Sequence, residues 1–140
     1  MHQALMRTTF RETAGSARPV HNAIRGQGGT WCEMDNLISR DPVPGRFRAA
    51  LAETYGDRLE RAVLFGSRAR GDFRPDSDYD IAVFIHDPEG WLDEVIRLAS
   101  LGTSILLDTG AVISAKPFRA GAYNGNGALM RAIRGEGLDL

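Results

Sequence analysis

Apolar residues first recur at regular intervals from Pro44 onward. Their spacing of i, i+3, i+4, i+7 and i+8 is typical of one stripe of an amphipathic helix. The stripe comprises Phe47, Ala50, Leu51, Thr54 and Tyr55. Gly56 follows directly, and a glycine at this place is expected to end the helix.

Two short apolar runs predict neighbouring buried strands. The first covers residues 59–65 and stops at Gly66, and the second, rich in Ile, Val and Phe, covers residues 79–85. Runs of this length bounded by turn residues are typical of strands inside a sheet. Between them we expect a short helix opening over residues 67–71 and a loop over residues 72–76.

The second half of the chain predicts a long helix, a third strand and a short final helix. Asp87 is the expected N-cap of the long helix and Pro88 its first residue, and the helix should run to about Leu107. Its expected core-facing residues are Leu92, Val95, Ile96 and Ala99. Residues 111–116 predict the third strand, closed by Pro117. The final helix carries Leu129, Ala132 and Ile133 at helical spacing.

This order of elements predicts a small α/β (α+β) domain in which a mixed β-sheet is backed by helices. We assign the domain to residues 34–140. Residues 1–33 show no sustained helical or alternating pattern, and we expect them to form a disordered tail. Because the patterned sequence begins near Met34, this methionine is an alternative start of the protein.

Composition narrows the classes of function. The formal charge is −1, from 17 basic and 18 acidic residues, so there is no overall basic field of the kind that binds DNA. The single cysteine, Cys32, excludes an internal disulfide framework. No apolar run approaches the roughly 20 residues of a membrane span. We therefore expect a cytoplasmic protein with no membrane or DNA partner.

Gly66 and Ser67 mark a candidate phosphate site. They stand where a buried strand should give way to a helix, so free backbone N–H groups and the positive end of the helix dipole converge there. Gly66 lets the backbone approach phosphate oxygens closely, and the Ser67 hydroxyl can donate a further hydrogen bond. Taken alone, the pair is more typical of a helix cap after a turn.

Asp78 and Asp80 are a candidate metal site. They are separated by one residue at the start of a predicted strand, so the period of two places both carboxylates on one face. Mg²⁺ prefers such oxygen ligands and commonly combines one or two carboxylates with substrate phosphates. A lone Asp-x-Asp is more often a pair of solvated loop acids. Here the apolar run behind the pair places it at the mouth of a buried strand.

Three arginines, Arg68, Arg70 and Arg74, interleave with Asp72 and Asp76. Arginine is suited to bidentate contacts with phosphate, and we assign Arg68 to the nucleotide site. The alternative for all three arginines is a solvated or weak ion pair with the loop acids.

The stretch GSRARGDFRPDSDYD, residues 66–80, resembles the signature of the nucleotidyltransferase superfamily that includes DNA polymerase beta, and within it the minimal nucleotidyltransferases. The resemblance covers residues 59–84 directly. It implies a nucleotidyltransferase fold with ATP or another nucleoside triphosphate at Gly66 and Ser67. It further implies two Mg²⁺ ions held chiefly by Asp78 and Asp80 as catalytic residues.

The sequence departs from that family at one position. Members usually carry a third carboxylate on a later strand, where it binds the catalytic metal and helps to deprotonate the acceptor hydroxyl. Here the residue in the expected place is Ser114, and Asp108 is the less favoured substitute.

Two functions from different classes follow. The first is Mg²⁺-dependent transfer of a nucleoside monophosphate to a hydroxyl on a partner protein, an RNA or a small molecule. Minimal nucleotidyltransferases similar to this one are commonly antitoxins of a helical HEPN ribonuclease toxin, which is therefore the expected partner. The alternative is a catalytically degenerate binding module that neutralises or scaffolds a partner by contact. Ser114 favours the second function, and the intact Gly-Ser and Asp-x-Asp favour the first.

Overall fold

Asp41 fixes where the first described helix begins. In the computed structural model, which describes residues 40–140, its carboxylate caps α2 (Pro42–Tyr55) by accepting a 3.0 Å hydrogen bond from the amide of Val43. Gly56, at φ 53°, ends α2 and opens the short 3₁₀ helix η1 (Gly56–Arg58). The tail predicted over residues 1–33 and the alternative start at Met34 lie outside the described residues.

The apolar stripe of α2 does pack into the core. The buried residues of α2 are Val43, Pro44, Phe47, Leu51 and Tyr55. Ala50 is half-buried and Thr54 is exposed. The buried face of α2 therefore follows Phe47, Leu51 and Tyr55 and is rotated slightly from the predicted stripe. The predicted helix itself is confirmed.

The two apolar runs form the centre of the sheet, as predicted. They are β1 (Leu59–Phe65) and β2 (Tyr79–Ile85), which pair antiparallel. β3 (Ile113–Arg119) pairs parallel with β2, and the short β4 (Leu138–Asp139), which sequence reasoning missed, pairs antiparallel with β1. Within the described residues the strand order is β3-β2-β1-β4, which confirms the expected mixed sheet.

The bounds predicted for the third strand are wrong at both ends. β3 starts at Ile113, two residues later than expected, and passes through Pro117 to Arg119. Proline has no backbone N–H to donate. It is tolerated here because β3 lies at the edge of the described sheet and pairs only with β2, so no donor is needed on its open side.

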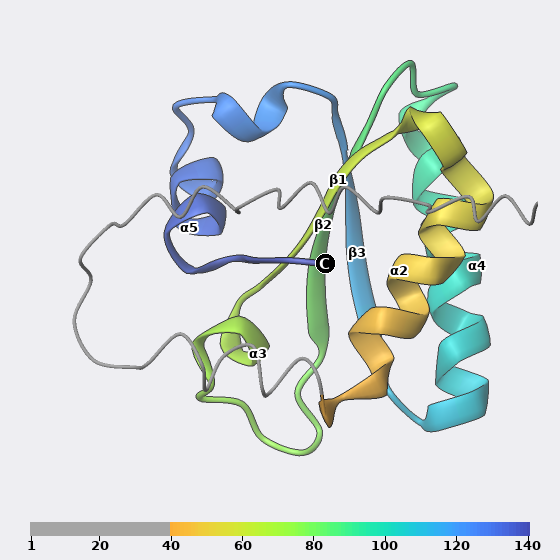
Figure 1. Ribbon diagram of the computed structural model, residues 1–140, viewed down its shortest axis with the longest axis vertical. Coiled ribbons are helices and arrows are strands. Elements are labelled where there is room, and N and C mark those ends of the chain that lie inside the picture. The colour runs from red at the N-terminus through yellow and green to blue at the C-terminus, as the bar shows by residue number, and fades with distance from the viewer. Residues whose placement is uncertain (1–39) are drawn as a thin grey trace, which may run out of the picture.

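Helices cover both faces of the sheet (Figure 1). On one side lie α2 and the long helix α4 (Trp91–Thr109), and on the other lie η2 (Ala122–Asn124) and α5 (Ala128–Glu136). Two apolar clusters correspond to these faces, a larger one centred on residues such as Phe47, Ile81 and Leu98 and a smaller one around Phe84 and Ile133. The four-residue helix α3 (Ser67–Arg70) lies at one end of the sheet.

The predicted start of the long helix is wrong. Asp87 is not its N-cap but a turn residue at φ 46°, and α4 begins at Trp91 with Gly90 as N-cap. The first helical bond runs from the amide of Glu94 to the carbonyl of Gly90, over 3.0 Å. Residues 87–90 therefore form a turn before the helix starts.

The predicted core-facing side of α4 is also wrong. Leu92 and Ile96 are 63% and 56% exposed, Ala99 is exposed and Val95 is half-buried. The buried residues are Glu94, Leu98, Gly102 and Ile105. Glu94 and Gly102 belong to the buried face of α4, but a search for apolar residues alone does not find them. A Cβ on Gly102 would lie 3.4 Å from the carbonyl oxygen of Ile113, so glycine allows close packing of α4 on β3.

Glu94 joins α4 to the preceding elements through a buried network. Its side chain is fully buried and accepts hydrogen bonds from the Tyr55 hydroxyl at 2.8 Å, Arg58 at 3.1 Å and Arg97 at 3.1 Å, and from the amide of Glu89 at 3.2 Å. Burial alone would raise the pKa of Glu94, but these hydrogen bonds and the two guanidinium charges outweigh it and lower its pKa. The carboxylate thus stays charged and paired.

The last helix forms where predicted but turns a different side to the sheet. Ile133 is buried as expected, whereas Met130, not Leu129, is its buried companion. Leu129 is 44% exposed and Ala132 is exposed. Across residues 40–140, none of the helices combines the length and apolar character needed to cross a membrane.

Candidate metal and nucleotide site

The turn after β1 brings the backbone against Asp80. Gly66 follows the last residue of β1 and adopts φ 75° and ψ −157°, a region that essentially only glycine occupies. A Cβ built at Gly66 would lie 2.8 Å from Oδ2 of Asp80. Glycine therefore permits both the backbone conformation and the close approach of this carboxylate to the turn.

The backbone hydrogen bonds of the turn come from its later amides, not from its first two. The amides of Ala69 and Arg70 donate to the carbonyl of Gly66 at 3.1 and 3.0 Å, and the amide of Gly71 donates to that of Ser67 at 2.9 Å. Within residues 40–140 the amides of Ser67 and Arg68 make no such bond. They and the Ser67 hydroxyl are the groups that can receive an anionic ligand here.

Asp78 and Asp80 flank a tyrosine that fixes their side of the strand. Tyr79 is buried in the cluster under α2, and its hydroxyl donates to Asp41 at 2.6 Å. Its amide donates to the carbonyl of Val112 at 2.9 Å, so the extended pairing with the β3 segment already includes Tyr79. Strand alternation then turns Asp78 and Asp80 away from this cluster. Their sharing of a metal ion stays a prediction.

Tyr79 is held as a hydrogen-bond donor by its surroundings. Burial, followed by the hydrogen bond to Asp41 and the charge of that carboxylate, raises the pKa of Tyr79 to about 12. The phenol is therefore protonated at neutral pH. This contact connects the start of α2 to the start of β2 and so steadies the strand end that carries both acids.

Ser114 lies beside Asp80, as its place in the sequence predicted. The parallel register of β2 and β3 pairs these two residues directly. Asp108 is not in this position. It lies in the last turn of α4, and its carboxylate pairs with Arg46 of α2 at 2.9 Å. The structure therefore places a serine, not a carboxylate, next to Asp80 on the neighbouring strand.

Lys116 is the site residue that sequence reasoning missed. Its Nζ lies 3.2 Å from Oδ1 of Asp80 and 3.2 Å from Oγ of Ser114. The sequence offers one indication of this role: Lys116 follows Ser114 by two residues on a predicted strand, so both side chains lie on the same face. The contact of Lys116 with Asp80 can be inferred from this spacing only when β3 is known to pair parallel with β2.

The donor set fits one hard divalent cation. Among residues 40–140 no group of three or more His, Cys, Asp or Glu side chains is arranged to hold a metal ion. Two carboxylates, Asp78 and Asp80, are instead available at one strand end. Mg²⁺ commonly uses one or two protein carboxylates and completes its shell with water and phosphate oxygens. Such an ion fits this chemistry if a nucleotide supplies the remaining ligands.

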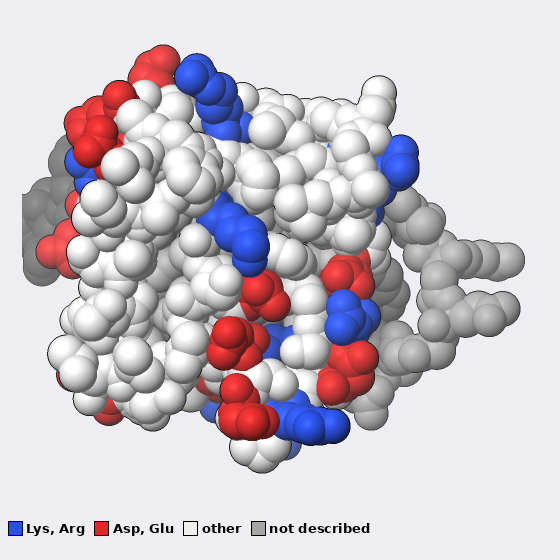
Figure 2. All heavy atoms as spheres, turned by 180° about the vertical axis from the view of Figure 1, so that it is seen from behind, with Lys and Arg blue, Asp and Glu red and all other residues white. Residues whose placement is uncertain are grey.

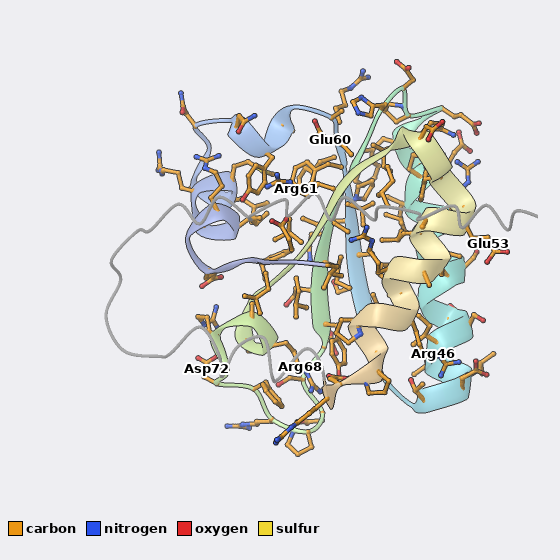
Figure 3. All side chains as sticks on the ribbon, in the orientation of Figure 1. Arg46, Glu53, Glu60, Arg61, Arg68 and Asp72 are labelled. Carbon is orange, nitrogen blue, oxygen red and sulfur yellow. The ribbon has the colours of Figure 1, made fainter. Side chains whose placement is uncertain are left out.

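Arg68 has local partners in the structure. Its guanidinium stacks over the rings of Phe73 and Tyr79, with centroid distances of 4.4 and 4.2 Å. It also donates to the carbonyls of Ser77 and Pro75, at 3.0–3.1 Å and 3.3 Å. Figure 3 shows it between α3 and the first turn of α2. These contacts hold the loop before β2, and its contact with a nucleotide stays a prediction.

Arg70, at the end of α3, forms ion pairs, and Arg74, in the following loop, is exposed. Arg70 contacts Asp72 and Glu136, each at 3.3 Å. In the view from behind, acidic and basic side chains gather at the end of the molecule where Figure 1 shows α3, and uncharged surface extends toward the α4 side (Figure 2). The charges near the site are therefore mixed, in keeping with the net charge of the chain.

Part of the chain is similar in sequence to known nucleotidyltransferases. Residues 50–115 match the model of the family described as polymerase beta, nucleotidyltransferase. Two curated proteins of Methanocaldococcus jannaschii, both named as putative protein adenylyltransferases, are 42% identical over 69 residues and 32% identical over 56 residues. These stretches are 49% and 39% of this chain. They are 63% and 57% of the relatives, so the chain spans less than two thirds of the relatives' lengths.

A solved structure agrees on the fold. The crystal structure of a putative nucleotidyltransferase from Sulfolobus solfataricus superposes with a TM-score of 0.52 and 18% sequence identity. The superposition covers 81% of this chain and 90% of that chain. At this identity the likeness concerns the arrangement of sheet and helices.

Proposed function

We propose that this chain, which matches the polymerase beta nucleotidyltransferase family over residues 50–115 and is similar to a putative protein adenylyltransferase, transfers a nucleoside monophosphate from a nucleoside triphosphate to a hydroxyl group of a partner. The observation that carries the proposal is Asp80 at the start of β2, with its carboxylate against the Gly66 turn and Asp78 two residues before it in the sequence. A pure binding surface gives no reason for two carboxylates beside a turn with free amides. The relatives' names favour ATP as donor and a protein as acceptor.

The residues have distinct roles in this proposal. Asp78 and Asp80 would hold Mg²⁺, which supplies charge neutralisation of the triphosphate when bound. The amides of Ser67 and Arg68 and the Ser67 hydroxyl receive phosphate oxygens. The acceptor oxygen forms a new bond to the α-phosphorus while the bond from that phosphorus to the bridging oxygen breaks. Pyrophosphate leaves, and the proton of the acceptor hydroxyl passes to solvent.

A second candidate function is favoured by Ser114. This residue occupies the place beside Asp80 where a third carboxylate would activate the acceptor hydroxyl. The alternative is therefore a degenerate module that binds nucleotide and metal but neutralises its partner by contact. A small helical HEPN-type toxin is the partner that the family resemblance suggests for either function.

Radiolabel transfer tests the proposal. The protein would be incubated with Mg²⁺ and the product of the neighbouring gene, using ATP labelled at either the α- or the γ-phosphorus. We expect label on protein from the α position only, and its loss in Asp78→Asn and in Asp80→Asn. Asp76→Asn, an exposed acid of the same loop, is the matched control and should retain transfer. Transfer that survives in both site variants would contradict the proposal, and nucleotide binding without transfer would support the second candidate.

A further inference from the structure

Lys116 gives the site a fixed positive charge of its own. It is the only lysine among the 140 residues, against sixteen arginines. Its ammonium bridges Oδ1 of Asp80 and Oγ of Ser114, each at 3.2 Å, and lies 5.4 Å from the centre of the Phe65 ring. An ammonium has three donors. Two are used by Asp80 and Ser114, and the third is available to a ligand.

The pair is too exposed to serve mainly as a structural ion pair. The side chains of Lys116 and Asp80 are 45% and 33% exposed, and ion pairs at this exposure contribute little to the stability of the fold. Lysine also has a flexible four-carbon stem. The contact can therefore open without unfolding the strand, so that the ammonium moves from Asp80 to a neighbouring anion.

Charge and ligand number limit how many divalent ions fit here. The two carboxylates of Asp78 and Asp80 are opposed by one ammonium, and Ser114 adds no charge. One divalent ion can use both carboxylates and phosphate oxygens. Among residues 40–140, no third carboxylate joins these two to hold a second ion, which would also lie beside a like charge, an unfavourable arrangement.

From this arrangement, and resting on the proposed function, we infer that the site binds one divalent ion per nucleotide and that Lys116 takes the place of a second cation. With the triphosphate bound, Asp78 and Asp80 would hold the metal ion, which supplies charge neutralisation, and the ammonium of Lys116 would contact the phosphates. The role is positional and electrostatic, and Ser114 helps to orient the ammonium through its hydroxyl.

The inference predicts opposite effects of one substitution on two ligands. In Lys116→Met, Mn²⁺ alone should bind about 3-fold to 10-fold more tightly, because Asp80 no longer has a competing cation. A non-hydrolysable ATP analogue with Mn²⁺ should bind about 10-fold to 100-fold more weakly, because a charge-assisted hydrogen bond is lost. Arg119→Met removes an exposed positive charge from the same strand and should change neither affinity.

Counting bound Mn²⁺ by electron paramagnetic resonance at saturating nucleotide gives the second readout. We expect one ion per protein in the wild type and two in the double variant Ser114→Asp with Lys116→Met, which supplies a third carboxylate and removes the competing cation. Ser114→Asp alone should stay at one, because Lys116 would pair with the new carboxylate.

Two outcomes would overturn the inference alone. Two Mn²⁺ ions in the wild type, or unchanged nucleotide affinity in Lys116→Met, would do so while leaving the proposed function intact. Failure of the folded wild-type protein to bind either ligand would overturn the proposed function and this inference with it.

Discussion

The two oxygens of Asp80 have different surroundings. Oδ1 accepts from Lys116, whereas Oδ2 faces the Gly66 turn, where a Cβ would come within 2.8 Å. Gly66 is therefore constrained twice, by its backbone conformation and by the carboxylate beside it. Gly71, at the other end of α3, shares a positive φ of 87°, but a Cβ added there would have no atom within 4 Å.

This contrast between the two glycines gives a prediction. Gly66→Ala and Gly71→Ala should each lower the free energy of unfolding by about 1–3 kcal/mol, because alanine is strained at positive φ. Only Gly66→Ala should also weaken Mn²⁺ binding, because its methyl group displaces Asp80. Urea unfolding and Mn²⁺ titration measure both quantities. Equal metal affinity in the two variants would show that the Gly66 turn does not position Asp80.

At the scale of elements, strands were more predictable than helix faces. The bounds of β1 and β2 could be read from the sequence because each is a continuous apolar run ended by a turn residue. The buried face of α4 could not, because Glu94 enters it only through hydrogen bonds from three other side chains. The end of β3 was misplaced because proline is tolerated on an edge strand, and the edge is a property of the sheet.

The corrected face of α4 predicts which residues carry stability. Leu98→Ala should lower the free energy of unfolding by about 2–5 kcal/mol, since it removes a fully buried side chain. Ile96→Ala, two residues earlier and 56% exposed, should cost less than about 1 kcal/mol. Chemical denaturation of the two variants checks this. A larger loss for Ile96→Ala would show that the face first expected from the sequence is the buried one.

The Glu94 network predicts a pH dependence of stability. Because the pKa of Glu94 is lower in the folded protein than in the unfolded chain, the unfolded state binds more protons in acid. The ionised Glu94 carboxylate therefore stabilises the fold above its pKa in the unfolded chain, which is about 4.3. This stabilisation is lost as the pH falls through its lower pKa in the folded protein. Between pH 6 and pH 3 the wild type should lose more stability than Glu94→Gln. Parallel pH profiles from urea unfolding would contradict this role.

At the scale of the whole molecule, the candidate site is assembled from segments that the sequence alone does not place together. The Gly66 turn and the start of β2 could be paired in advance, because both belong to one signature. Lys116 could not, since it reaches Asp80 only through the parallel register between β2 and β3. Ser114 does lie beside Asp80 on the neighbouring strand. That it stands in the place of a third carboxylate stays a prediction, to which we add the proposed effect of the charge on Lys116.

The proposed function requires that Asp78 and Asp80 jointly hold a divalent ion beside the Gly66 turn. Anomalous diffraction from crystals grown with Mn²⁺ and a non-hydrolysable ATP analogue tests it most directly. We expect one anomalous peak within about 2.0–2.3 Å of a carboxylate oxygen of each aspartate, with triphosphate oxygens against the Ser67 amide. Nucleotide bound with no peak between the two aspartates, or a peak elsewhere on the protein, would contradict it.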